Sequence, residues 1–319
     1  MMGTVIRIVA EGADDRLVLS ALDDAFAEFE RLDRIFNRYD ETSELARLNS
    51  RAVKKEVVAS SELFELTSAA LDYQVASLGA FDITVAPLID LWRRCALEDR
   101  LPSAEEIGAS QALTGVGKIE LQPSRRGVRF HRDGVAMDFG GLAKGFAVDR
   151  AVEILRAAGL DRAFVDAGSS SMAGFAVRPP RWRIGVRHPL REDQLAGYID
   201  LGDEALSSSG GDQRPLTIGR RSYSHIFDPR TGLPADGGLG ATVVGDSAVR
   251  AEVMSKMVLL LGCEAAFARF EELGWKAEGL LMKDVGDGRI EARCSEGFTQ
   301  FTPVAAAALD LPLLEAHST

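Results

Sequence analysis

The hydrophobic positions of residues 135–159 change their spacing in the middle of the segment. Val135, Met137 and Phe139 alternate with smaller or polar residues, which is the period of a strand with one buried face. From Leu142 onward the apolar residues follow a helical spacing instead. The pattern predicts a strand, a tight turn made by two glycines, and a helix.

The double glycine, Gly140-Gly141, has two interpretations that the residues alone leave open. The first turn of the following helix offers N–H groups and a positive dipole end, which suit a phosphate. Glycine at a strand-to-helix junction can equally be required for steric reasons alone. With Lys144 and Gly145 next in the chain, the spacing matches neither the dinucleotide fingerprint nor the P-loop.

The same periodicities predict an α+β chain. Apolar residues recur every three or four positions from residue 22 to 36 and again from 247 to 262, which indicates two helices. Residues 4–10 suit a first strand. Residues 128–137 predict a hairpin, because Asp133-Gly134 is a strong turn signal between two apolar runs.

Several residues could contribute to a binding site, and each also has a structural interpretation. The loops expected at 166–171 and 207–212 are rich in small residues, so they could close around a ligand or lie on the surface. Tyr39 could stack on a flat heterocycle or be an ordinary half-buried tyrosine. His225 is followed by Asp228-Pro-Arg-Thr-Gly, a turn whose polar side chains suit a structural role. Glu252 and Lys256 have the spacing of a helical ion pair.

Composition and charge exclude some classes of protein. The chain has 319 residues and a formal net charge of −11, with no basic block, so we expect no nucleic-acid partner. The three cysteines are far apart and odd in number, which predicts reduced, packed thiols. No apolar run approaches the roughly 18 residues of a membrane span. The N-terminus lacks the pattern of a signal peptide, so we expect a cytoplasmic protein.

Five stretches that occur in the same order resemble the ApbE family of FAD:protein FMN transferases. They cover most of the chain and are specific together: Met2-Gly3-Thr4, Tyr39 with 43–49, Gly79-Ala80-Phe81-Asp82 with Pro87-Leu88, residues 138–149, and residues 225–232. The resemblance implies a T-fold-like α+β fold, with residues 1–319 as a single domain. That domain would have two lobes of mixed or antiparallel sheets flanked by helices, and FAD would bind in a cleft between them.

The resemblance also implies a reaction. A serine or threonine hydroxyl of an acceptor flavoprotein would attack the FMN phosphorus of FAD with the help of Mg²⁺, and AMP would leave. Some members of the family instead hydrolyse FAD to FMN and AMP, so a FAD pyrophosphatase is an alternative. A non-catalytic relative that binds FAD or another nucleotide is a second alternative.

Site residues follow from the resemblance position by position. Those implied at the flavin and the rest of the dinucleotide are Met2, Tyr39, Ala80, Phe81, Asp82, Lys144, Arg150, His225 and Ile226. Those implied at the metal are Ala147 through its carbonyl, Glu252 and Ser255. His225 and Lys256 are the implied catalytic residues.

The metal helix departs from the family pattern. Where the family has Ala-Asp-Ala-Leu-Ser/Ala-Thr, residues 251–256 read Ala-Glu-Val-Met-Ser-Lys. Glu252 could still bind a metal, but the Lys256 ammonium has no lone pair to donate and repels a cation. Two hypotheses follow: an active transferase in which Lys256 supplies part of the metal's charge, or a protein that binds FAD without turning it over.

Overall fold

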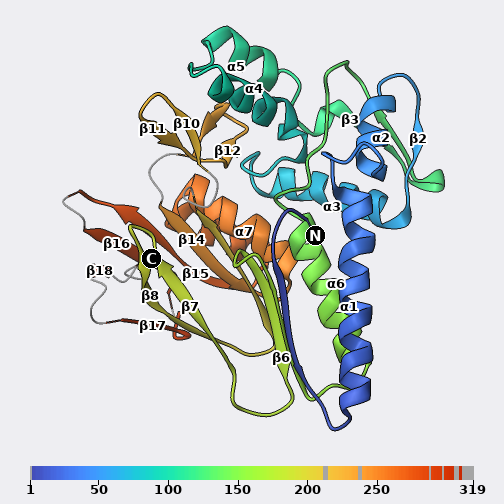
Figure 1. The fold of residues 1–319 in the computed structure, drawn as a ribbon. Helices are drawn as coiled ribbons and strands as arrows, with labels where there is room; N and C mark the ends of the chain where they lie inside the picture. Colours follow the sequence, from blue (N-terminus) through green and yellow to red (C-terminus); the bar gives the residue numbers. More distant parts are fainter. Residues whose placement is uncertain are drawn as a thin grey trace. The chain divides into compact units, whose positions relative to one another are not determined.

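The computed structural model describes residues 2–210, 215–235, 239–286, 289–296, 298–304 and 309–310. The chain divides into two compact units. Unit 1 consists of Met1–Glu30, Leu142–Asp212 and Gly237–Thr319, and unit 2 of Arg31–Gly141 and Gln213–Asp236. The long helix α1 (Asp15–Phe36) contains the first boundary between them. Figure 1 shows the elements of both units in sequence colours.

Unit 1 is built on one large sheet. Its described strands run in the order β1 (Ile6–Glu11), β5 (Arg162–Ala167), β6 (Ser171–Ala176), β9 (Glu204–Gly210), β14 (Gly240–Gly245), β15 (Ala277–Asp284), β16 (Ile290–Cys294) and β18 (Leu309–Asp310). Neighbouring strands are antiparallel except β16 and β18, which are parallel. The mixed sheet and its helices confirm the predicted α+β class.

Both faces of this sheet are covered. The helices α6 (Ala143–Ala157) and α7 (Ala248–Leu261) contact its central strands, and α8 (Cys263–Glu272) contacts β15. A smaller sheet of β7 (Trp182–His188), β8 (Arg191–Leu201) and β17 (Phe301–Pro303) shares a second apolar core with β9, β14, β15 and β16. Strands β6 and β14 are therefore buried along almost their whole length.

The side chains of strand β9 alternate between the two faces of the large sheet. Leu206 belongs to the apolar core under the smaller sheet. Its neighbour Ser207, and Ser209 two residues further on, instead contact the α7 residue Ser255. Because successive strand residues point to opposite faces, Ser207 and Ser209 face the helices while Leu206 faces the core.

The crossing of α6 and α7 is unusually close. A Cβ atom added at Gly145 would lie 2.5 Å from the carbonyl oxygen of Ala248 and 2.8 Å from the backbone nitrogen of Val249. One turn further along α6, the Asp149 carboxylate accepts hydrogen bonds from the backbone N–H groups of Ala248 and Val249, at 2.7 and 3.0 Å. The Ser247 hydroxyl donates to it as well. Residues of α6 thus cap the N-terminus of α7 and fix the crossing.

Unit 2 is smaller and mainly helical. Its helices are α2 (Glu44–Arg51), α3 (Ser61–Ala76), α4 (Ala86–Leu97) and α5 (Ala104–Gln111), with short 3₁₀ turns η1 (Ile83–Val85), η2 (Val116–Lys118) and η3 (Pro123–Arg125). One sheet has the order β2 (Val57–Val58), β4 (Gly127–Phe130), β3 (Ile119–Gln122). Two separate two-stranded sheets are also present: β10 (Leu216–Ile218) pairs with β11 (Arg221–Tyr223), and β12 (Phe227–Asp228) pairs with β13 (Leu233–Pro234). Trp92 of α4 packs against Ile218 and Phe227 of these strands.

The hairpin predicted at residues 128–137 is wrong. The turn exists, because Gly134 has φ +87°, but residues 135–139 join no strand ladder. The side-chain amide of Asn49 takes the place of a neighbouring strand, donating to the Met137 carbonyl and accepting from the Met137 N–H, both at 2.9 Å. Strand β4 pairs with β3 and β2 instead. The helix predicted after the double glycine is confirmed as α6.

The loop predicted at 207–212 is also wrong in its first part. Residues 207–210 are buried strand at the end of β9, paired with β14. Small polar residues are tolerated there because their hydroxyls find partners inside, such as Thr242 for Ser208 at 2.9 Å. Residues 211 and 212 of the predicted loop lie outside the described residues.

The structure also bears on the predictions for the cysteines and for membrane spans. Cys95, Cys263 and Cys294 are free and buried, as predicted. Among the helices that the structure describes, none combines the length and the apolar character needed to cross a membrane.

Replacing Gly145 tests the crossing of α6 and α7. We expect Gly145→Ala to lower the free energy of unfolding by about 1–3 kcal/mol, because the new methyl group meets backbone atoms that cannot rotate away. Gly108 in the exposed helix α5 is the matched control, since a Cβ there meets nothing within 4 Å. Gly108→Ala should be neutral or stabilising by up to about 1 kcal/mol. Urea unfolding measures both, and equal effects would contradict the close crossing.

Candidate functional site

A buried carboxylate between two lysines is the main charged feature of unit 1. Glu252 of α7 has a side chain only 2% exposed, and its Oε1 lies 3.3 Å from the Nζ of Lys144 on α6. Its Oε2 lies 3.9 Å from the Nζ of Lys256, one turn further along α7. The lysine side chains are 20% and 17% exposed. We call these three residues the lysine–glutamate cluster; its formal charge is positive.

The Lys256 ammonium is held in place by its own helix. Its Nζ donates a hydrogen bond of 2.9 Å to the backbone carbonyl of Glu252, so the side chain folds back instead of extending into water. Burial lowers the pKa of this ammonium to about 8, although the Glu252 charge opposes the change. Within the described residues, neither Glu252 oxygen accepts a hydrogen bond. The carboxylate therefore depends on the two ammonium charges for compensation.

Three serine hydroxyls fill the neighbouring space. The Ser255 Oγ lies 3.1 Å from the Ser207 Oγ and 2.8 Å from the Ser209 Oγ, and it donates to the Glu252 carbonyl at 3.1 Å. Ser207 in turn donates to the carbonyl of Ser170. The hydroxyl of Ser255, which the resemblance implies as a metal ligand, is thus already engaged with three groups of the protein.

These residues do not fit a divalent cation. Hard cations such as Mg²⁺ prefer several oxygen ligands, whereas the one carboxylate here has an ammonium beside each oxygen. Ala147, whose carbonyl was the third implied ligand, lies fully buried within α6. Across the described ranges of the chain, no group of three or more His, Cys, Asp or Glu side chains is placed to hold a metal ion.

The N-terminal end of α6 adds to the positive charge of the cluster. Lys144 is the second residue of the helix, and the N-cap residue Leu142 makes no hydrogen bond to the first turn through its side chain. A helix N-terminus carries roughly half a positive charge. Lys144 therefore joins the helix end to the cluster through its contact with Glu252.

Tyr39 of unit 2 is exposed but held rigidly. The residue is 60% exposed, and the guanidinium carbons of Arg38 and Arg93 lie 4.6 and 4.9 Å from the ring centroid. Its hydroxyl accepts a hydrogen bond from Arg93 and donates to Asp138 at 3.4 Å. Burial opposes the charge of Arg38, but Asp90 and Asp138 outweigh it and raise the pKa of its guanidinium. Cation–π contacts and hydrogen bonds thus hold the ring in one position, while the residue remains partly exposed.

The implied nucleotide residues Ala80, Phe81 and Asp82 lie together in unit 2 and are buried. The Asp82 carboxylate accepts hydrogen bonds from the backbone N–H and the hydroxyl of Thr84, at 2.7 and 2.6 Å, and so caps the turn η1. Burial raises the pKa of this carboxyl, while these hydrogen bonds lower it. Asp82 therefore stabilises the turn η1, whether or not it also contacts a nucleotide.

His225 and Ile226 lie between β11 and β12, before a tight turn. Ile226 accepts a hydrogen bond from the Ala235 N–H through its carbonyl, at 2.7 Å. In the turn, the Asp228 carboxylate accepts from the Arg230 N–H at 2.9 Å. Gly232 closes the turn at φ +71°. These contacts support the structural interpretation of the turn, which sets the position of the loop that carries His225.

The remaining implied residues, Arg150 and Met2, are not members of the lysine–glutamate cluster. Arg150 is exposed on α6 and forms ion pairs with Glu153 at 2.6 Å and Glu28 at 3.6 Å. Met2 is partly buried and has φ +50°. The structure therefore brings Lys144, Glu252 and Lys256 together by ionic contact.

Sequence reasoning missed several residues around these sites. The Ser207 and Ser209 hydroxyls, the Arg38 guanidinium and the Asp138 carboxylate all contact implied site residues. A signal existed for Asp138, which begins the quoted stretch at 138–149. Ser207 and Ser209 fell within the expected ligand loop at 207–212, but nothing in the sequence pointed to their partner Ser255, which lies on a helix 48 and 46 residues away.

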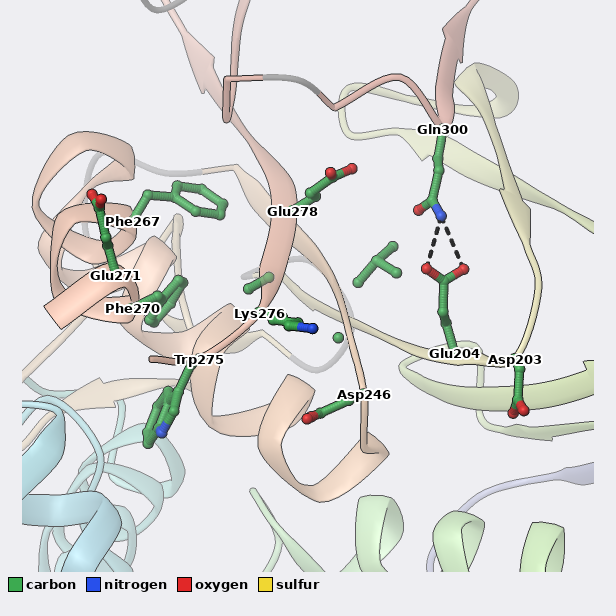
Figure 2. Close-up of a pocket in the computed structure, with 13 residues that line it drawn as sticks. Asp203, Glu204, Asp246, Phe267, Phe270, Glu271, Trp275, Lys276, Glu278 and Gln300 are labelled. Carbon is green, nitrogen blue, oxygen red and sulfur yellow. Dashed lines mark hydrogen bonds between the residues drawn. The ribbon is translucent and has the colours of Figure 1, made fainter. Parts of the chain in front are cut away.

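A pocket of about 620 Å³ lies elsewhere in unit 1 (Figure 2). Phe267, Phe270 and Trp275 form its aromatic part, and its acidic lining residues are Asp203, Glu204, Asp246, Glu271 and Glu278. Burial, and then the neighbouring charge of Glu204, raise the pKa of Glu278. Such a lining repels an anionic dinucleotide, and no implied site residue lines it.

Removing the Glu252 charge tests the lysine–glutamate cluster. We expect Glu252→Gln to lower the free energy of unfolding by about 3–5 kcal/mol, because two buried ammonium groups lose their common counter-charge. The double variant Glu252→Gln/Lys256→Met should lose about 1–2 kcal/mol less than the sum of its single variants. Urea unfolding of the four proteins measures this coupling.

The control is an exposed ion pair. Glu272 has a side chain 64% exposed and lies 2.7 Å from Arg269, so Glu272→Gln should change the free energy of unfolding by less than about 1 kcal/mol. Strict additivity in the Glu252 and Lys256 variants would show that the two residues do not interact.

Comparison with known proteins identifies the family. The sequence profile of the ApbE family matches residues 2–278. A FAD:protein FMN transferase of Klebsiella pneumoniae is 26% identical over 273 residues, covering 83% of this chain and 84% of that protein. The crystal structure of the ApbE protein from Thermotoga maritima aligns with a TM-score of 0.78 at 28% identity, covering 88% of this chain and 92% of that one. The apo form of the Pseudomonas stutzeri flavinyl transferase ApbE aligns with a TM-score of 0.79 at 26% identity, covering 93% of each chain. The family profile spans most of the sequence, and the chain therefore belongs to the ApbE family.

Proposed function

We propose that this chain transfers the FMN half of FAD to a serine or threonine hydroxyl of an acceptor flavoprotein and releases AMP. The hydroxyl oxygen forms a bond to the phosphorus of the FMN half. The bond from that phosphorus to the bridging oxygen breaks, and AMP leaves with the bridging oxygen. We assign the hydroxyl proton to the imidazole of His225, because histidine is the side chain used most often as a general base.

The positive cluster at the N-terminal end of α6 carries this proposal. Phosphoryl transfer depends mainly on positioning and on stabilising charge that spreads over the phosphate oxygens. The ammonium groups of Lys144 and Lys256 are held within 3.3 and 3.9 Å of the same carboxylate. They are fixed before any ligand binds, so they require little reorganisation when a diphosphate binds.

The choice of FAD as the substrate rests on the relatives in the family. The Klebsiella pneumoniae relative, named FAD:protein FMN transferase, matches over most of both chains. In unit 2, the ring of the exposed residue Tyr39 offers a flat surface of the kind on which an isoalloxazine ring stacks. FAD contains both a flat aromatic ring and a diphosphate, which are the two kinds of group that these residues suit.

The test must separate transfer from hydrolysis and from binding alone. The purified chain is incubated with FAD and a soluble lysate of the cell from which it comes. AMP and FMN are followed by chromatography, and covalently bound flavin is followed by fluorescence of denatured protein bands. We expect a fluorescent acceptor band and an equal amount of AMP, without free FMN. Lysate alone is the control for flavin transfer by other proteins.

The alternative functions give different results in the same assay. Free FMN and AMP in equal amounts, with no labelled band, would indicate a FAD pyrophosphatase. Quenched FAD fluorescence with neither AMP nor FMN would indicate a protein that binds FAD without turning it over. Either outcome would contradict the proposed transfer.

A further inference from the structure

The lysine–glutamate cluster occupies the position at which the resemblance implies a metal site. The implied metal ligands there are Glu252, Ser255 and Ala147, and the structure shows that they do not fit a divalent cation. Glu252 has an ammonium beside each carboxylate oxygen. The hydroxyl of Ser255 is engaged with two serines and with the Glu252 carbonyl.

The Lys256 ammonium has the properties of a fixed internal cation. Its hydrogen bond to the Glu252 carbonyl, at 2.9 Å, fixes the end of an otherwise flexible side chain. The side chain is largely buried, and its Nζ lies 3.9 Å from the Oε2 of Glu252. A cation held in this way loses little rotamer entropy when an anion arrives, because the side chain is already ordered.

The surrounding charges decide what the site attracts. With one carboxylate and two ammonium groups, the cluster has an excess of one positive charge, and the adjoining N-terminus of α6 adds a positive dipole end. A second cation at Glu252 would be repelled by both ammonium groups at close range. A diphosphate would instead be attracted by both ammonium groups and by the helix end.

We infer that the Lys256 ammonium replaces the divalent cation of this site, so that the chain binds the diphosphate of a flavin nucleotide without a metal ion. The inference rests on the proposed function, because it takes FAD as the ligand. It assigns Lys144 and Lys256 as the diphosphate-binding cations and Glu252 as the residue that positions both. The site is then a metal-free variant of the metal site implied by the resemblance.

Two binding measurements on the full chain test this inference. The first is the dissociation constant for FAD, measured by flavin fluorescence in EDTA and in excess MgCl₂. The second is the binding of Mn²⁺ without FAD, measured by the electron paramagnetic resonance signal of the free ion. We expect equal FAD affinity in the two buffers, within about twofold. We also expect no stoichiometric Mn²⁺ binding.

Variants separate the role of the ammonium from a general loss of structure. Lys256→Met removes the charge and should weaken FAD binding at least about tenfold in both buffers. Glu252→Asp/Lys256→Thr supplies two oxygen ligands in place of the ammonium, so Mn²⁺ binding should appear and FAD binding should become Mg²⁺-dependent. Lys276→Thr, at an exposed lysine of unit 1, is the matched control and should leave both measurements unchanged.

The outcomes distinguish failure of this inference from failure of the proposed function. FAD binding that tightens at least about tenfold with Mg²⁺ would overturn the inference while leaving the proposed function intact. Binding of one Mn²⁺ per chain to the unmodified protein would also overturn it. The absence of FAD binding in both buffers would overturn the proposed function, and with it the assignment of the diphosphate to this cluster.

Discussion

The close crossing of α6 and α7 is the constraint on which the charged site depends. Gly145 allows the two backbones to approach, and the Asp149 carboxylate then caps the first N–H groups of α7. This arrangement places Lys144 of one helix opposite Glu252 of the other. A larger residue at position 145 would separate the helices and weaken that contact. The packing of the helices therefore determines the electrostatics of the site.

Within this arrangement, one buried carboxylate organises two cations. A buried carboxylate without compensation is costly, so Glu252 depends on the two ammonium groups beside it. Lys256, although burial lowers its pKa, keeps an ion-pair partner and a backbone acceptor. The result is a fixed positive region next to a helix N-terminus. Such preorganised charge is what phosphoryl transfer requires from a protein.

Local patterns predicted some features well and missed others for physical reasons. Helical periodicity over 22–36 and 247–262 predicted α1 and α7. The buried residues of α1 form one stripe, whereas α7 is buried on nearly every side. The alternation at 135–139 looked identical to a strand, but its hydrogen bonds go to the side chain of Asn49, far away in the chain. Serines at 207 and 209 looked like a loop, since their buried partner Ser255 lies on a distant helix. The resemblance named Glu252 and Lys256, but only the structure shows Lys144 beside them.

A crystal structure of the chain grown with Mn²⁺ and a flavin nucleotide would show whether Lys256 takes the place of a metal ion. Anomalous scattering locates Mn²⁺ independently of how the surrounding density is interpreted. We expect no manganese peak at Glu252, with the Lys256 ammonium and the nucleotide diphosphate facing each other across that position. A manganese ion bound to the Glu252 carboxylate, with Lys256 turned away, would contradict it.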